Sequence, residues 1–284
     1  MQTLKIALLA ITSVMFYQCE SVKKEDTTDA GAKKEKKRPL AIENGKFFAV
    51  NGEKYMYGGE DSTWHFKVTN SLLKEEQFHY GIGREKFHAL ITPEFINREE
   101  ADKIFPDSER FLSFKIGENI RAYSIELLTH HEVVNDVVDG KPVMAAYCVL
   151  ADLGAIYDRN MGGEVFTFAL SGYTYYDPEV WDGLDGFVFW DRETESTWWP
   201  LIGKGASGPM RDMPLQVYDK QYWTQTTWGE IKKMYPGQDI KVLKPGQEMD
   251  PPEDWNKFDE ATIQKVRNNL VEAPSVAPKW GNKK

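Results

Sequence analysis

Apolar and polar residues alternate along short stretches of the chain, and these stretches end at residues that favour tight turns. The clearest example runs from His130 to Cys148, where four valines precede Asp139-Gly140 and a second apolar run follows it. Asp-Gly readily adopts the positive backbone angles of a two-residue hairpin turn. We therefore expect a hairpin that brings Cys148 beside the histidines, because cross-strand partners lie about 5 Å apart.

Similar patterns predict further hairpins in series. Two short strands are expected within residues 40–60, joined at Asn51-Gly52. The other expected strand pairs are 111–116 with 120–124, 155–158 with 165–170, and 187–190 with 197–201. Closely spaced strands with turn residues between them favour antiparallel pairing over βαβ units.

Helical periodicity is expected in three longer segments. Residues 93–105 place Pro93 in a first turn and carry acidic residues in their N-terminal half. Residues 227–235 and 259–270 form the other two, with Asp259 as the N-cap of the last helix. The chain is thus predicted to be a β-rich α+β protein, with serial antiparallel hairpins in a sheet or barrel and a few peripheral helices.

The first residues have the pattern of an export signal. Lys5 precedes an apolar run over residues 6–16, and Cys19 follows closely after it. A cysteine at this place is typical of a bacterial lipoprotein, whose lipidated cysteine holds the mature chain on a membrane surface. We expect a lipoprotein-type signal peptide at residues 1–18, lipidation of Cys19, and a place in the cell envelope, facing the periplasm or on the outer membrane.

The composition changes sharply after the leader. Residues 19–39 are dominated by Lys, Glu, Asp, Thr and Ala and have nothing to bury, so a flexible charged tether is expected. Residues 40–272 carry the apolar patterns and are expected to form a single, monomeric β-rich domain. The Pro-containing residues 273–284 are expected to be a tail.

The overall composition excludes several classes of protein. A net charge of -9 argues against a nucleic-acid partner, which attracts basic surfaces. The chain has no run of the roughly 18 apolar residues that a membrane span needs, so the lipid anchor is the expected membrane contact. Two cysteines cannot form a disulfide framework.

The hairpin around Asp139-Gly140 carries the first candidate site. His131 and Cys148 are suited to a soft or borderline ion such as copper or zinc, and Glu132 or Asp136 is placed to orient the imidazole. Additional ligands, if needed, would come from His65, His79 or His88. The alternative is structural: a histidine hydrogen-bonded within the fold and a cysteine buried as a small hydrophobe.

The same residues have the composition of a catalytic triad. Cys148 would be the nucleophile and His131 the base, with Asp136 or Asn135 as the group that orients it. The chain lacks a local signature of cysteine hydrolases, and exposed thiols oxidise readily outside the cytoplasm. We therefore assign no catalytic residue and expect a protein that is not primarily an enzyme.

A third hypothesis concerns the tryptophans that crowd the second half of the chain. Flat indole rings stack on sugars and other planar ligands, which makes Trp181, Trp198 and Trp199 candidates for a ligand-binding surface. The alternative is ordinary β-sheet core, where tryptophan is enriched.

An acidic segment at residues 175–186 is a weaker candidate. Its carboxylates are Asp177, Glu179, Asp182 and Asp185, and it contains two glycines. Such oxygen ligands suit calcium, although their order does not follow the EF-hand spacing. A solvated acidic loop is the alternative, and the role of the segment stays open.

Six stretches of the chain, taken in order, match the pattern of one known family. They are HALITPEF (88–95), IRAYSIELLTHHEVVND (120–136), GKPVMAAYC (140–148), FTFALSG (166–172), WDRETESTWW (190–199) and TTWGEIKKMYPG (226–237). On these residues the chain resembles the bacterial and archaeal domain-of-unknown-function family 3179 (DUF3179), over roughly residues 60–243. The resemblance implies a shared fold and leaves the molecular role unsettled.

The chain departs from the family pattern at the end of the hairpin. The family commonly reads Tyr-Cys-Pro-Leu-Cys where this chain continues from Cys148 to Ala151, so the second thiol is missing. If the common form binds a metal through its cysteine pair and the histidine that matches His131, this chain has lost part of that set. The segment 175–186 has no counterpart in the family pattern.

Overall fold

The structure is a computed structural model that describes residues 43–181, 183, 185–248 and 255–271. The expected signal peptide at 1–18, Cys19, the tether at 19–39 and the tail at 273–284 lie outside the described residues, as does Asp182. All described residues belong to one compact unit. The predicted β-rich α+β class is confirmed, but the described strands form several open sheets and no closed barrel.

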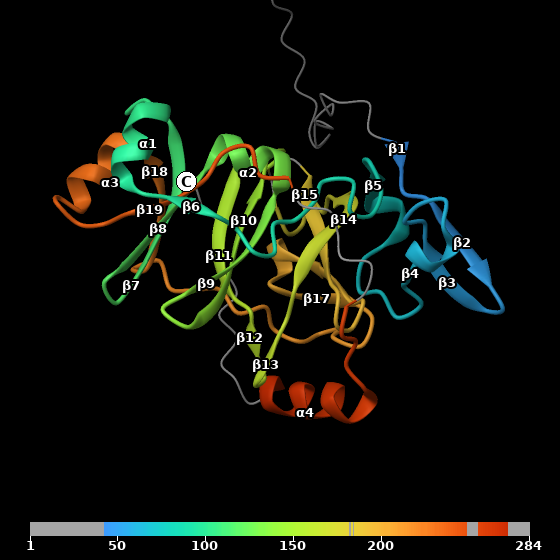
Figure 1. The fold of residues 1–284 in the computed structure, drawn as a ribbon. Coiled ribbons are helices and arrows are strands. Elements are labelled where there is room, and N and C mark those ends of the chain that lie inside the picture. The colour runs from blue at the N-terminus through green and yellow to red at the C-terminus, as the bar shows by residue number, and fades with distance from the viewer. Residues whose placement is uncertain (1–42, 182, 184, 249–254, 272–284) are drawn as a thin grey trace, which may run out of the picture. The chain divides into compact units, whose positions relative to one another are not determined.

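Two antiparallel sheets frame the centre of the fold (Figure 1). The six-stranded sheet has the order β1 (Glu43–Asn44), β5 (Phe78–Tyr80), β14 (Phe168–Tyr175), β15 (Gly186–Asp191), β16 (Thr197–Trp199) and β17 (Lys204–Ser207). The three-stranded sheet has the order β11 (Leu153–Asp158), β10 (Lys141–Cys148) and β9 (Val133–Val138). Their facing side chains share one apolar core, in which the rings of Tyr157 and Phe189 are 6.2 Å apart.

A third sheet forms a separate apolar cluster with two helices. Its order is β18 (Trp223–Thr227), β7 (Arg110–Ile116), β8 (Asn119–Ser124), β19 (Lys241–Leu243) and β6 (Phe95–Ile96). Helices α1 (Arg98–Ile104) and α3 (Trp228–Met234) pack against it, and Ala101, Trp228 and Ile231 are fully buried there. Two helices therefore cover one face of the third sheet. The three-stranded sheet, which carries Cys148, packs against the six-stranded sheet.

The Asp139-Gly140 hairpin forms as predicted. The two turn residues have φ angles of 54° and 72°, and Val138 pairs with Lys141 directly across them. The histidines, however, belong to helix α2 (Ile125–His131) and not to the strand. The Ser124 side chain caps the start of this helix, and Glu132 ends it in the left-handed conformation at a φ of 52°. Strand β9 therefore begins only at Val133.

Two other expectations needed correction. The segment 93–105 is not one helix, because β6 occupies its start and α1 begins after Asn97, whose side chain forms a capping box with Glu100. Strand β11 pairs with β10, and β14 pairs with β15 and β5, so the expected hairpin of 155–158 with 165–170 does not form. The glycines between β11 and β14 instead form the turn of a small hairpin, in which β12 (Asn160–Met161) pairs with β13 (Glu164–Val165).

Three further strands, one helix and three 3₁₀ turns complete the described part of the chain. They are β2 (Phe47–Val50), β3 (Glu53–Met56), β4 (Phe66–Lys67), α4 (Glu260–Val271) and the 3₁₀ turns η1 (Ser62–Trp64), η2 (Glu75–Gln77) and η3 (Pro200–Ile202). The Asp259 carboxylate accepts a 2.8 Å hydrogen bond from the Thr262 amide, which confirms the predicted N-cap of α4. No helix within the described ranges is long and apolar enough to cross a bilayer.

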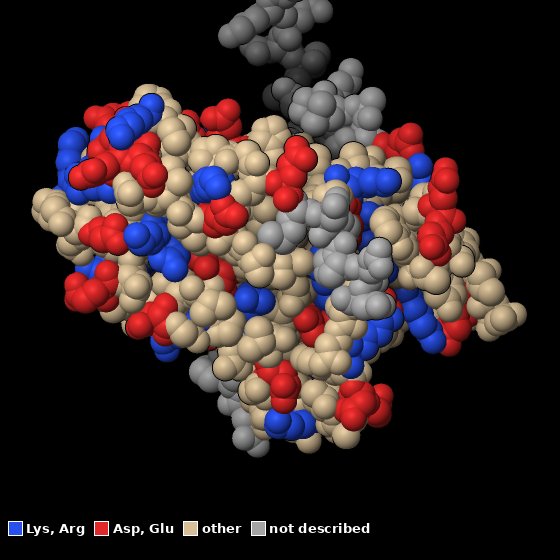
Figure 2. Space-filling model, in the orientation of Figure 1, with Lys and Arg blue, Asp and Glu red and all other residues tan. Residues whose placement is uncertain are grey.

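The surface carries both signs of charge. Figure 2 shows Lys and Arg side chains interspersed with Asp and Glu side chains over the visible face, including the region of α1 and α3. Many of these charges form exposed pairs, such as Lys233 with Glu230 at 2.7 Å. Exposed pairs of this kind stabilise a fold by only about 0–1 kcal/mol. The visible face carries no large patch of one charge sign that would indicate a binding surface.

Candidate functional site

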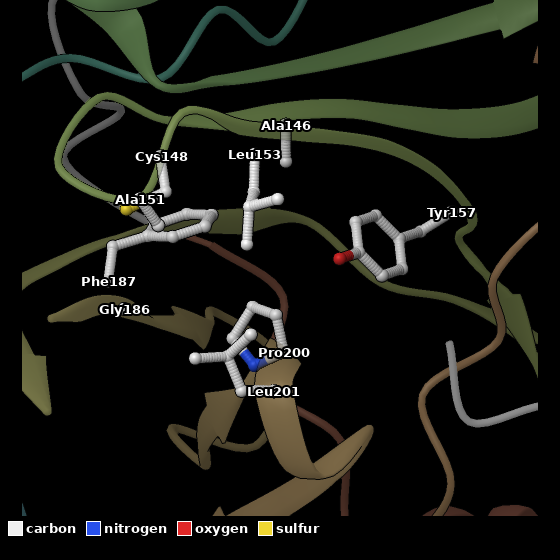
Figure 3. A pocket seen from close by; sticks show the side chains of 9 residues that line it. All are labelled: Ala146, Cys148, Ala151, Leu153, Tyr157, Gly186, Phe187, Pro200 and Leu201. Carbon is white, nitrogen blue, oxygen red and sulfur yellow. The ribbon is translucent and has the colours of Figure 1, made fainter. Parts of the chain in front are cut away.

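A small apolar pocket lies between the end of strand β10 and the six-stranded sheet (Figure 3). Its free volume is about 10 Å³, close to the least that holds one water molecule. The lining residues are Ala146, Cys148, Ala151, Leu153, Tyr157, Gly186, Phe187, Pro200 and Leu201. The pocket has room for one atom or one very small group beside the thiol.

Cys148 places its sulfur at this pocket. The residue is 3% exposed, and burial followed by the negative charge of Glu132 raises the pKa of the thiol to about 12. The thiol donates to the Asp185 carbonyl oxygen at 3.8 Å. The backbone amides of Ala151, Phe187 and Leu150 oppose the rise in pKa, because each favours a thiolate by hydrogen bonding to it. The sulfur is therefore protonated at neutral pH, yet its surroundings offer donors to a thiolate.

Tyr157 contributes the second polar group of the pocket. Its hydroxyl points into the cavity in Figure 3, and the residue is only 2% exposed. Burial and the nearby Cys148 thiol raise the pKa of the phenol well above its usual value. Tyr157 therefore presents a neutral hydroxyl to whatever enters the cavity.

Glu132 and His131 lie on the α2 side of the thiol. Glu132 is half-buried, and burial raises the pKa of its carboxyl group to about 8. His131 is held by a 2.8 Å hydrogen bond between Nδ1 and the His88 carbonyl oxygen. If Nδ1 carries the proton in that bond, Nε2 keeps its lone pair for a ligand. The Glu132 carbonyl oxygen accepts a 2.9 Å hydrogen bond from the Tyr147 amide, so Glu132 lies beside the end of β10. Among the described residues, no hydrogen bond joins His131 to Cys148.

The other two residues considered at this site have structural partners. The Asp136 carboxylate accepts hydrogen bonds from Arg121 Nε at 3.0 Å and from the Tyr123 hydroxyl at 2.8 Å. Asn135 is fully buried and locks two segments together through the Leu90 carbonyl and the backbone of Phe168. Asp136 therefore faces Arg121 and Tyr123, and Asn135 braces the backbone rather than orienting an imidazole.

Two of the three further candidate histidines are engaged elsewhere. His65 Nδ1 accepts from the Gly58 amide at 3.2 Å, and His79 Nδ1 lies 2.6 Å from Asp185 Oδ2 within the core. His88 contributes its backbone carbonyl to His131. Within the described residues, no group of three or more His, Cys, Asp and Glu side chains is arranged to hold a metal ion.

The tryptophan hypothesis is corrected for two of its three residues. Trp198 and Trp199 are 0% and 1% exposed, because they belong to strand β16 and fill the core, so they form no ligand-binding surface. Trp181 is half-buried. In the acidic segment, Asp185 is buried against His79, and Asp177 accepts from the Glu179 amide in a local turn. At least Asp185 is thus no part of a solvated loop.

Sequence reasoning missed two groups with unusual chemistry. Tyr157 was unremarkable in a strand of mixed residues, and only the β10–β11 register, which pairs Cys148 with Leu153 and Met144 with Tyr157, brings it to the thiol. Asp191 follows directly after the expected strand 187–190. It is fully buried, and burial raises its pKa to about 7. The Asp-x-x-Thr spacing of the turn after this strand was the available signal, since Thr194 donates to the Asp191 carboxylate.

The fold and the site define a β-rich α+β protein that carries a buried thiol in a small pocket between two sheets. The model of the family described as protein of unknown function (DUF3179) matches residues 84–267, and the chain belongs to this family. The matched segment contains every residue that lines the pocket. No curated protein and no solved structure matches the chain.

Proposed function

We propose that this protein is an exported accessory protein that binds one soft metal ion at Cys148. Copper(I) is the preferred ion, because it favours thiolate and imidazole ligands and accepts two of them, whereas a structural zinc ion takes about four. His131 would be the second ligand, and Glu132 would supply negative charge close by. A role in metal handling fits a protein without an assigned catalytic residue.

The observation that carries the proposal is the Cys148 thiol, which is 3% exposed and lines a cavity of about 10 Å³. The amides of Ala151, Phe187 and Leu150 each lower the thiol pKa against the effect of burial. Hydrogen bonds to a sulfur favour its thiolate, which is the form that binds a metal ion. Metal binding would displace the thiol proton, since a coordinated cysteine is a thiolate.

The surroundings of the thiol support the same proposal. His131 has the orientation common among metal-binding histidines, with one ring nitrogen fixed by a backbone carbonyl. The Glu132 carboxyl group has a pKa of about 8, and a cation nearby would favour its charged form. The cavity of about 10 Å³ suits a single ion better than an organic ligand.

The test is a copper(I) titration against a colorimetric chelator under anaerobic conditions, together with elemental analysis of the purified protein. The wild-type protein should bind one copper ion, Cys148→Ser should abolish binding, and His131→Ala should weaken it at least about tenfold, as expected for a lost ligand. His130→Ala is the matched control, because this neighbouring histidine is exposed. Metal-free protein whose melting temperature does not respond to copper(I) would contradict the proposal.

The Tyr157 hydroxyl favours a second candidate function. A hydroxyl that faces an apolar cavity suits a small neutral molecule that accepts one hydrogen bond. In that case Tyr157→Phe should weaken binding and Cys148→Ser should not. The pKa of about 12 at Cys148 disfavours the cysteine-nucleophile alternative, because little thiolate forms at neutral pH.

The proposal includes a lipid anchor at Cys19 that keeps the domain at the surface of the cell envelope. It is supported by the apolar run over residues 6–16 and by the charged, tether-like residues 19–39. Mass spectrometry of the mature N-terminus tests it directly. A diacylated Cys19 supports the proposal, and an N-terminus elsewhere, or protein in the soluble fraction, contradicts it.

A further inference from the structure

A second cluster of polar groups lies at the other end of the six-stranded sheet. It consists of Arg84, Glu85, Trp190, Arg192 and Trp255, and we call it the Trp255 cluster. Its members come from three separate segments: the loop after β5, the end of β15, and the segment that precedes α4. All of them fall within the part of the chain that matches the family.

A close crossing of two backbones places Arg84 and Glu85 in this cluster. Gly83 and Gly172 have φ angles of 92° and 76°, and a Cβ atom on Gly172 would lie 2.0 Å from the Gly83 carbonyl oxygen. The Glu85 amide then donates to the Leu170 carbonyl at 3.0 Å. Only glycine permits this approach, which sets the loop firmly over the bulge of β14.

The two arginines are buried and differently paired. Arg192 is 1% exposed and forms a two-pronged ion pair with Glu85, at 3.0 Å and 2.6 Å. Arg84 is 2% exposed and stacks on the Trp190 ring at 3.6 Å. Its carboxylate partner, Glu195, lies 3.3 Å away and is shared with Lys257.

Among the described residues, this pairing leaves one positive charge without a carboxylate. The cations are Arg84, Arg192 and Lys257, and their paired carboxylates are Glu85 and Glu195. The neighbouring acidic groups are turned away: Glu193 accepts from the Thr167 amide, and Asp191 accepts from Trp198 and Thr194. The cluster can therefore take up one further negative charge.

Three buried N–H groups in the cluster have no acceptor among the described residues. They are Arg192 Nη1, Trp190 Nε1 and Trp255 Nε1. The Trp190 and Trp255 rings are 5.5 Å apart, and the Arg192 guanidinium carbon lies 5.9 Å from the Trp255 ring. Buried donors without acceptors are rare in native proteins, and several in one place call for a partner that supplies oxygen atoms.

We propose that the Trp255 cluster binds one small oxyanion, as a carboxylate, phosphate or sulfate group. The anion accepts from Arg192 Nη1 and from the indole N–H groups, and it supplies the missing negative charge. Access is from the Glu195–Lys257 side, where the Glu195 and Lys257 side chains are 35% and 58% exposed and Trp255 is half-buried. A planar guanidinium with a free N–H edge is well matched to such a group.

Isothermal titration calorimetry tests the proposal with acetate, phosphate and sulfate separately, each up to about 10 mM at constant ionic strength. At least one anion should show saturable 1:1 binding and raise the melting temperature. The three probes distinguish a carboxylate site from a phosphate or sulfate site. Absence of saturable binding for all three anions would overturn the proposal.

Trp255→Phe is the diagnostic variant, because it keeps the aromatic ring and removes one donor. It should weaken anion binding at least about tenfold, the usual effect of losing a hydrogen bond to a charged group. Trp223→Phe is the matched control, since the Trp223 indole already donates to the Tyr218 carbonyl at 2.7 Å. Unchanged affinity in a folded Trp255→Phe protein would also overturn the proposal, as would equal losses in both variants.

Discussion

The indole nitrogen of Trp198 donates a 2.8 Å hydrogen bond to Asp191 Oδ2, and both residues are completely buried. Thr194 donates to the same carboxylate through its hydroxyl and its amide, which closes the turn between β15 and β16. Burial outweighs these hydrogen bonds and raises the pKa of Asp191 to about 7. The centre of the six-stranded sheet thus contains an acid that titrates near neutral pH.

This relationship predicts that the protein loses stability as the pH rises from about 4 to about 7. Over this range the unfolded chain releases the Asp191 proton, whose ordinary pKa is 3.8, while the folded chain retains it. The free energy of unfolding falls by roughly 1.4 kcal/mol for each unit by which folding raises the pKa of Asp191. The fall is complete once the pH exceeds the pKa of Asp191 in the folded protein. Urea unfolding at several pH values measures it. Asp191→Asn should flatten the dependence, and an unchanged slope in that variant would contradict the assignment.

Two glycines allow the cost of backbone strain to be compared with the cost of a steric clash when each is replaced by alanine. Gly140 and Gly162 both have positive φ angles, of 72° and 62°. A Cβ atom on Gly140 meets nothing within 4 Å, whereas one on Gly162 would lie 2.6 Å from the Val266 carbonyl oxygen of α4. Gly140→Ala should therefore cost about 1 kcal/mol from strain alone. Gly162→Ala should cost more and loosen α4, which denaturant unfolding and hydrogen exchange at Val266 would show. Equal costs would contradict this account.

Local signals explain what the sequence predicted correctly. The turn at Asp139-Gly140 is specified by two residues that tolerate positive φ, so β9 and β10 were found with their register. Helix α2 was missed as a whole, and it ends at Glu132 in a left-handed conformation that this residue type does not favour. The prediction therefore placed Cys148 on its strand and misplaced His131.

Non-local packing explains what could not be predicted. The pairing of β14 with β5 joins Tyr173 to Tyr80, and no local pattern records it. The ion pair between Glu85 and Arg192 spans 107 residues of sequence. Tyr157 reaches the thiol pocket only after two sheets have packed together. The sequence therefore predicted the cysteine of the candidate site, but not the residues that line the pocket around it.

The buried ion pair gives a prediction about stability. Glu85→Ala leaves the Arg192 guanidinium, 1% exposed, without its carboxylate partner. Removing one member of a buried pair usually costs about 3–5 kcal/mol, because the remaining charge stays out of water. Lys233→Ala is a suitable comparison, since it breaks an exposed pair with Glu230 and should cost no more than about 1 kcal/mol. Thermal and urea unfolding give both values, and similar losses would contradict the burial argument.

The Cys148 thiol should be unreactive in the folded protein. It is 3% exposed, and its pKa of about 12 leaves almost no thiolate at neutral pH. In a Cys19→Ser background, Ellman's reagent should therefore label Cys148 slowly in native buffer and rapidly in guanidinium chloride. Rapid labelling of the native protein would show that the thiol is exposed and would reopen the question of a catalytic cysteine.

The final prediction restores a second soft ligand to the pocket. Ala151 lines the same cavity as Cys148 and lies three residues after it, the spacing at which paired cysteines bind zinc or copper. Ala151→Cys should raise copper(I) affinity at least about tenfold, because a second thiolate replaces a weaker or absent ligand. Ala151→Ser has a side chain of similar size without a soft donor atom and should bind copper no better than the wild-type protein. A folded Ala151→Cys protein without any gain in affinity would show that metal ions do not reach this pocket, and the proposed function would fall with it.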